Sequence, residues 1–166
     1  MSVSLTCAIT GNVVETLTSN VPAVSSSANS LTHNGFSTGG TYNATSTPPA
    51  TKCCFMSQAL SGGSATMDMT SLTGTQGTVT LSTLKLVWVE FYNPATNANK
   101  ITITKGASNG LGLDAAGATF LICLDPGASW GGFLNGAGVA IDGTHKTWDL
   151  TGTAAQALNV AIVAGI

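Results

Sequence analysis

The stretch Leu84-Lys-Leu-Val-Trp-Val-Glu-Phe-Tyr92 decides the fold. It is apolar on both faces except at Lys85 and Glu90, which is typical of a central strand covered on both sides. Asn93-Pro94 follows as a turn signal. The chain then returns as Asn99 to Lys105, with Ile101 and Ile103 on one face. We therefore expect this second segment to be the antiparallel partner of the first.

The rest of the chain contains further short strand patterns with turn signals every 8–12 residues. The expected strands lie at residues 3–9, 13–17, 52–60, 65–69, 118–124, 139–141, 144–150 and 157–163. The weak helix candidate at 154–158 is interpreted as a turn that leads into a strand. Together these features predict an all-β fold, an antiparallel β-sandwich of the jelly-roll type, in a single domain covering residues 1–166.

Two turn signals determine how the expected strands pair. Asp142-Gly143 suits the positive φ angles of a two-residue turn, and it predicts a hairpin between 139–141 and 144–150. Gly11-Asn12 predicts a turn between the first two strands.

A long polar segment separates these first strands from the rest. Residues 18–51 are rich in Ser, Thr, Asn and Gly, and they include Pro22, Pro48 and Pro49. A loop of this length is unusual inside a compact domain. Residues 19–51 are therefore expected to form either an arm that lies on a neighbouring subunit or a projecting loop with a short hairpin at Asn34-Gly35.

The surface carries very little charge. Only 7% of the 166 residues are charged, with five lysines, no arginine and a net charge of −2, whereas an ordinary domain is about a quarter charged. Weakly charged surfaces associate readily, so a homo-oligomer is expected, as a trimer or a higher cyclic assembly. The scarcity of cations argues against a nucleic-acid partner. No signal peptide or membrane-spanning run is visible, so synthesis and folding in a cytoplasm are expected.

The four cysteines fit a reducing compartment. Cys7 and Cys123 lie in apolar runs, so they are expected to be buried free thiols, although a disulfide between them stays open. Cys53 and Cys54 are adjacent and point to opposite faces of a strand. His33 and His145 have no cysteine at metal-ligand spacing, so no metal site or cofactor is expected.

Two segments match the G-x-S-x-G nucleophile pattern, around Ser108 and around Ser129. Asp142 and His145 follow Ser129 in the order that α/β-hydrolases use. That chemistry requires a strand, a sharp turn and a helix that carries the serine. Neither match leads into a helical pattern. No catalytic residues are assigned, and a hydrolase is kept only as a minor alternative.

The three tryptophans differ in their surroundings. Trp88 is expected in the core, because it lies in the central strand, whereas Trp130 and Trp148 are assigned to either the core or an interface. The sequon Asn43-Ala-Thr45 is interpreted as a chance match in the absence of a secretion signal.

From about residue 65 onward the chain resembles a group of small structural proteins of tailed bacteriophages. The matching segments are 67–73, 84–93, 108–111, 120–127, 137–141 and 157–165. The resemblance covers roughly residues 65–166. It implies a β-sandwich virion component without enzymatic activity, located at the head or the tail.

The resulting expectation is a non-catalytic structural protein that self-associates in a bacteriophage particle. A capsid-associated role is favoured, as a decoration, cement or minor capsid protein with the major capsid protein as a partner. The alternative is a carbohydrate- or receptor-binding sandwich of a phage tail or cell surface, which would use Trp130 and Trp148 as aromatic platforms.

Overall fold

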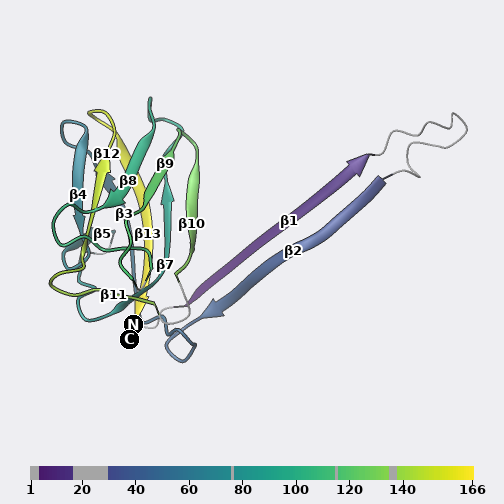
Figure 1. The fold of residues 1–166 in the computed structure, drawn as a ribbon, viewed down its shortest axis with the longest axis horizontal. Helices are drawn as coiled ribbons and strands as arrows, with labels where there is room; N and C mark the ends of the chain where they lie inside the picture. The colour runs from purple at the N-terminus through teal and green to yellow at the C-terminus, as the bar shows by residue number, and fades with distance from the viewer. Residues whose placement is uncertain (1–3, 17–29, 76, 115, 135–137) are drawn as a thin grey trace, which may run out of the picture. The chain divides into compact units, whose positions relative to one another are not determined.

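The computed structural model describes residues 4–16, 30–75, 77–114, 116–134 and 138–166. These residues form thirteen strands and no helix, in antiparallel sheets. Two of the sheets pack face to face as a β-sandwich, which confirms the predicted fold class (Figure 1). The described part of the chain holds no helix with the length and apolarity that a membrane crossing requires.

The first sheet of the sandwich has five strands, because the short β11 continues the edge that β10 begins. In order across the sheet they are β10 (Ser129–Phe133) with β11 (Val139–Ala140), β7 (Lys85–Tyr92), β13 (Ala157–Gly165) and β3 (Lys52–Ala59). The segment that opened the sequence analysis is therefore central, as predicted. It lies between β13 and the edge formed by β10 and β11.

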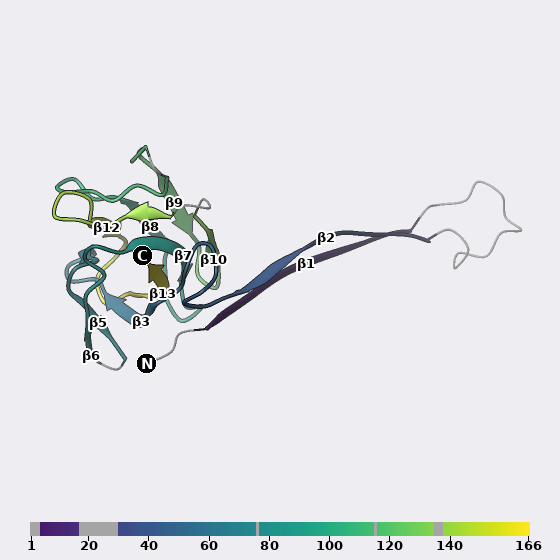
Figure 2. The ribbon, with the colours of Figure 1, turned by 90° about the horizontal axis from the view of Figure 1, so that it is seen from below.

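The second sheet has four strands, in the order β4 (Ser64–Asp68), β12 (Thr147–Thr151), β8 (Ile101–Lys105) and β9 (Leu121–Leu124). Seen from below, β12, β8 and β9 form one layer, and β3, β13, β7 and β10 form the other (Figure 2). A small hairpin of β5 (Leu72–Gly74) and β6 (Gly77–Val79) lies beside β3.

The core fills the space between the two sheets. The largest buried side chain, Trp148, meets the ring of Phe91 edge-on at a centroid distance of 5.2 Å. Its Nε1 donates to the Leu111 carbonyl at 2.9 Å, so the polar atom of the indole is satisfied inside the core. Trp148 thus belongs to the core, which settles one of the two tryptophans that the sequence left open.

Two predicted strand pairings are wrong. β8 was expected beside β7, but it pairs with β12 and β9 in the opposite sheet. The connection crosses between the sheets at Asn93, whose buried side chain bonds backbone carbonyls on the other side. The segments on either side of Asp142-Gly143 also separate, because β11 pairs with β7 and β12 pairs with β4 and β8.

The reason for the second error lies in the side chain of Asp142. Its Oδ1 accepts hydrogen bonds from the backbone N–H groups of Thr144 at 2.7 Å and His145 at 2.8 Å. This is the local capping that aspartate commonly provides in turns. The turn therefore exists, but it carries the chain from one sheet to the other and does not close a hairpin.

The N-terminal predictions also need correction. β1 (Leu5–Thr16) runs without a break through Gly11-Asn12, so the expected turn there is absent. β2 (Ser30–Tyr42) occupies part of the expected loop, and Asn34-Gly35 lies inside this strand. Pairing between β1 and β2 outweighs the local preference of Gly and Asn for turns. Residues 17–29 of that loop lie outside the described residues.

Contacts within the chain divide it into two compact units. One consists of residues 1–5 and 42–166, and the other is Thr6–Thr41, which contains the β1–β2 sheet. At one end of this sheet the hydroxyls of Thr6 and Thr41 are 3.2 Å apart. Strands of twelve and thirteen residues correspond to a ribbon about 40 Å long.

The segment at 118–124 was predicted to be a buried strand. The observed strand β9 is shorter and alternates, with Leu121 and Cys123 exposed and Ile122 and Leu124 buried. This alternation is typical of an edge strand with one solvated face. The turn predicted at 154–155, before β13, is present.

Candidate interaction surface

The face of the five-stranded sheet that points away from the four-stranded sheet carries several aromatic and aliphatic side chains. We call it the outer face, and the strand registers place the following residues on it: Cys53, Phe55, Ser57, Trp88, Glu90, Tyr92, Ser129, Gly131, Phe133, Asn159, Ala161 and Val163. Phe55 and Tyr92 are exposed, and the Phe55 side chain is 52% exposed. Exposed apolar side chains that gather on one face make it a candidate interaction surface.

One half of the outer face is covered by the segment that precedes β3. Ala50, Trp88 and Val163 form a small buried cluster there. The Pro49 carbonyl lies so close to Gly165 that a β-carbon on that residue would collide with it. The ring of Tyr42 packs on Phe133 at a centroid distance of 4.3 Å.

The described residues of the sandwich leave the other half of the outer face uncovered. Across the sheet, one row consists of Phe55, Ala161, Glu90 and Gly131 in register. Glu90 is exposed and stands between two small residues. The next row on the same face consists of Ser57, Asn159, Tyr92 and Ser129, so polar and aromatic side chains alternate with the small residues here.

A groove adjoins this uncovered half. It has a volume of about 480 Å³ and lies between β3 and the β5–β6 hairpin. The residues that line it are Thr51, Lys52, Cys53, Cys54, Phe55, Gly74, Thr75, Thr78, Val79 and Thr80. Among these described residues Lys52 alone carries a charge.

Two hydrogen bonds hold the small hairpin against β3. The Lys52 Nζ donates to the Thr80 carbonyl at 2.9 Å, and the Thr75 N–H donates to the Phe55 carbonyl at 2.9 Å. Along an antiparallel strand the N–H and C=O of one residue point to one neighbouring strand, and those of the next residue point to the other side. The Phe55 carbonyl points away from β13, so the N–H and C=O of Cys53 also point to this edge.

The outer face of the four-stranded sheet is different in character, because threonines dominate it. The Thr66 hydroxyl donates to Asp149 Oδ1 at 2.7 Å, and the Ala107 N–H donates to Asp149 Oδ2 at 2.8 Å. Leu121 is the large apolar residue exposed here, at 67%. The Thr104 hydroxyl donates to the Asp149 backbone carbonyl at 3.4 Å, so hydroxyl groups bonded to Asp149 form much of this face.

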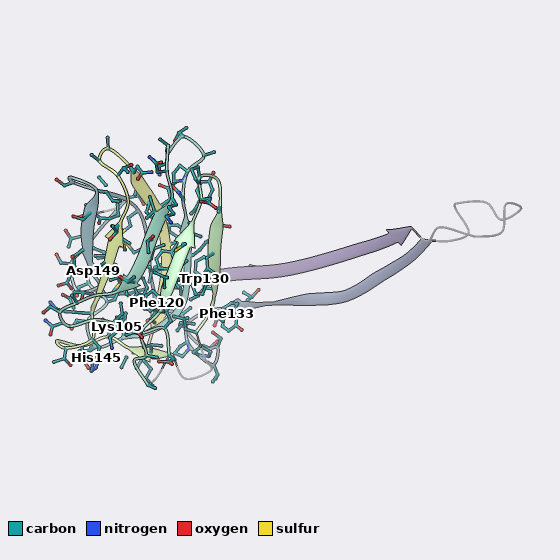
Figure 3. The ribbon with its side chains drawn as sticks, turned by 45° about the horizontal axis from the view of Figure 1, so that its top comes forward. Lys105, Phe120, Trp130, Phe133, His145 and Asp149 are labelled. Atoms are coloured by element: carbon teal, nitrogen blue, oxygen red, sulfur yellow. The ribbon has the colours of Figure 1, made fainter. Side chains whose placement is uncertain are left out.

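The residues of the hydrolase alternative do not come together. Ser129 pairs with Tyr92, whereas Ala140, two residues before Asp142, pairs with Lys85. Seven residues along one strand correspond to about 23 Å. Figure 3 shows the neighbouring residue Trp130 on one side of the sandwich and His145 on the other. The arrangement of Ser129, Asp142 and His145 that nucleophilic catalysis would need is therefore absent.

Asp142 and His145 nevertheless contact each other at 3.2 Å. Both are exposed, and the contact belongs to the turn described above. The pKa of Asp142 lies well below its usual range, because Thr144 and His145 donate hydrogen bonds to the carboxylate. In the second G-x-S-x-G match, the Ser108 carbonyl accepts a hydrogen bond from the Thr147 hydroxyl, which indicates a structural role.

The cysteines correct a further prediction. Cys53, Cys54 and Cys123 are free thiols, so Cys123 forms no disulfide with Cys7, whose side chain lies outside the described residues. Cys123 is exposed, so the expectation that it is buried is wrong, whereas Cys54 is buried and Cys53 half-buried. Burial and the neighbouring Cys53 raise the pKa of the Cys54 thiol.

The sequence analysis did not identify Phe55, Tyr92 and Phe133 as exposed residues. Alternation along β3 separates Phe55 from Cys54 and Met56, but both faces of this segment are apolar, so the pattern does not reveal which one is covered. Trp130, the tryptophan that remains a surface candidate, is 36% exposed and stacks on Phe91 at a centroid distance of 6.1 Å.

Comparison of the chain with protein-family models, with curated proteins and with solved structures finds no match.

Proposed function

We propose that this chain is a non-catalytic structural protein that self-associates and forms part of a bacteriophage particle. Its place would be at the capsid, as a decoration, cement or minor capsid protein in contact with the major capsid protein. A trimer or a higher cyclic oligomer would be the assembled form.

The observation that carries the proposal is the two-stranded unit Thr6–Thr41. A sheet of only two strands is marginally stable in water by itself. It gains stability when a further surface covers it, and a neighbouring subunit can supply that surface. This unit takes the place of the arm that the sequence predicts at 19–51.

The composition of the chain and the outer face support the same proposal. The sequence has a net charge of −2 and few charged residues, so copies repel one another only weakly. The uncovered half of the outer face, with Phe55 and Tyr92, supplies apolar area for an interface. The assignment to a phage particle rests on the segments of residues 65–166 that resemble phage structural proteins.

Native mass spectrometry of the full chain at micromolar concentration tests the self-association. We expect a single oligomer of three or more copies, and a stable monomer would overturn the proposal. Peptide mass spectrometry of purified phage particles, with heads separated from tails, tests the location. The chain should be recovered with the heads, and its absence from both fractions would contradict a virion role.

A carbohydrate-binding module remains the second candidate. Trp148 is fully buried, so this alternative now depends on Trp130, with Phe133 exposed on the same strand (Figure 3). A glycan array that compares the wild type with Trp130→Ala separates the two candidates. Sugar binding that this substitution abolishes would favour the module.

A further inference from the structure

The groove beside β3 suits an extended strand. Its floor includes the backbone edge of β3 at Cys53, and its opposite wall is formed by Thr78–Thr80. β6 pairs with β5 in a separate two-stranded sheet, so no ladder joins β6 to β3. Exposed strand edges of this kind accept a further strand from another chain.

The length of the free edge limits what can bind. The hydrogen bond from Thr75 occupies the Phe55 carbonyl, so an added strand can lie beside β3 only from Lys52 to Phe55. Phe55 stands exposed at the rim of the groove. The occupant is therefore a short extended segment with little charge.

Charge complementarity points to an occupant within the same sequence. Lys52 is the charged residue of the groove, and its Nζ uses one donor on Thr80, which leaves two of the three that an ammonium carries. Residues 6–41 contain a single acidic residue, Glu15, and no lysine or arginine. Glu15 belongs to β1, an extended strand near its C-terminal end.

We propose that β1 of a neighbouring copy lies antiparallel in the β3 groove, with Glu15 against Lys52. This inference rests on the self-association proposed above and names the surfaces that meet. If β1 of one copy runs antiparallel to β3 of the other and Glu15 lies opposite Lys52, then Val14 lies opposite Cys53 and Asn12 lies opposite Phe55. In this register the backbone of Val14 meets the free N–H and C=O groups of Cys53. The contact thus covers Asn12–Glu15 of one copy and Lys52–Phe55 of the other.

Charge reversal in the full-length chain tests this register. Glu15→Lys and Lys52→Glu each replace an attraction by a repulsion, and we expect each to weaken self-association about tenfold. The double variant Glu15→Lys/Lys52→Glu restores the opposite charges, and its dissociation constant should return to within about threefold of the wild type. Sedimentation equilibrium gives these constants, and circular dichroism checks that each variant is folded.

Mixing the two single variants shows whether the contact joins different copies. A Glu15→Lys chain carries lysine at both contact positions, and a Lys52→Glu chain carries glutamate at both. The contacts therefore become attractive only between unlike copies, and association of the mixture should exceed that of either variant alone. If Glu15 contacts Lys52 within one chain, mixing brings no recovery, and the inference is overturned.

The controls are Asp125→Lys and Lys100→Glu, which change exposed charges that lie outside both the groove and the outer face. They should leave the dissociation constant within about twofold of the wild type. Equal weakening by the control and groove variants would indicate a general charge effect and overturn the inference. If the wild type associates and the groove variants associate equally well, the inference fails while the proposed function stands. A monomeric wild type would overturn both.

Discussion

Asn93 and Leu124 join the two sheets of the sandwich, because Asn93 Nδ2 donates a hydrogen bond to the Leu124 carbonyl at 2.8 Å. Asn93 directly follows the central strand β7, and Leu124 ends the edge strand β9 of the opposite sheet. The Asn93 Nδ2 also donates to the Asn99 carbonyl at 3.2 Å, and the Asn93 Oδ1 accepts a hydrogen bond from the Asn97 Nδ2 at 2.6 Å. The side chain is fully buried, and all of its polar atoms have hydrogen-bond partners outside β7.

Replacement of Asn93 by leucine should therefore destabilise the sandwich. The substitution leaves the buried Leu124 carbonyl without this donor, whereas the Asn99 carbonyl keeps the hydrogen bond from Gln156. An unsatisfied buried group costs about 1–3 kcal/mol, so we expect a loss of about 1–3 kcal/mol in the free energy of unfolding. Urea denaturation followed by tryptophan fluorescence measures it. The exposed Asn159 on β13 provides the control, since Asn159→Ala should change stability by less than about 0.5 kcal/mol. Equal effects would contradict the role of Asn93.

Asn93 also shows what the sequence could and could not predict about the fold. Apolar runs identified β7, β3 and β13 as strands, because alternation and burial are properties of each segment alone. Which strands pair depends on where the chain crosses between the sheets. Those crossings are fixed by the side chains of Asn93 and Asp142, whose hydrogen-bond partners are distant in sequence or lie within a turn.

The position of the candidate interaction surface could not be predicted from the sequence either. Scarce charge predicts that the chain associates, and this is a property of the whole composition. It does not locate the interface, because Phe55 becomes a surface residue only where the outer face of its sheet is left uncovered. The strand β2 was missed for another reason: its Gly, Ser and Thr residues pair through the backbone and leave no apolar alternation in the sequence.

Gly165 should tolerate no side chain. A β-carbon at this position would collide with the Pro49 backbone carbonyl, which has little freedom to move, so Gly165→Ala should cost about 1–3 kcal/mol of stability. Gly132 on β10 has no atom within 4 Å of the corresponding position. Gly132→Ala should be neutral or slightly stabilising, because alanine restricts the unfolded chain. Thermal unfolding of both variants checks the pair, and equal melting temperatures would show that residues 49–50 do not cover this end of the outer face.

The ion pair of Asp68 and Lys146 predicts how stability depends on pH. Burial by itself raises the pKa of Asp68, but hydrogen bonds from Lys146 and Thr70 outweigh that effect and lower the pKa below its ordinary value. The folded state therefore binds this proton less readily than the unfolded state does, and the pair stabilises the fold at pH values above the unfolded pKa of about 4.

This contribution should be lost as the pH falls below about 4 and through the lowered pKa of the folded state. In Asp68→Asn the free energy of unfolding should vary less with pH across that range, while its value at neutral pH falls. Urea titrations from acidic to neutral pH measure the difference. A wild type and variant with parallel pH profiles would refute the assignment.

The three described thiols should react at different rates with an alkylating reagent. Cys123 is exposed, Cys53 is half-buried and Cys54 is buried, and the raised pKa of Cys54 lowers its thiolate fraction further. Peptide mass spectrometry after timed alkylation should give the order Cys123, Cys53, Cys54. Dilution below the dissociation constant should speed the reaction of Cys53 beside the groove and leave Cys123 unchanged. Faster alkylation of Cys54 than of Cys123 would contradict the burial of the Cys54 side chain.

Phe55 should contribute to association and not to folding, because more than half of its side chain is exposed. Aromatic residues at the centre of an interface commonly cost about 2 kcal/mol when truncated. Phe55→Ser should therefore weaken self-association more than tenfold and leave the melting temperature close to that of the wild type. Leu121→Ser is the matched control, because it removes an even more exposed apolar side chain from the opposite sheet. A larger loss of association in Leu121→Ser would place the interface on the threonine-rich face instead.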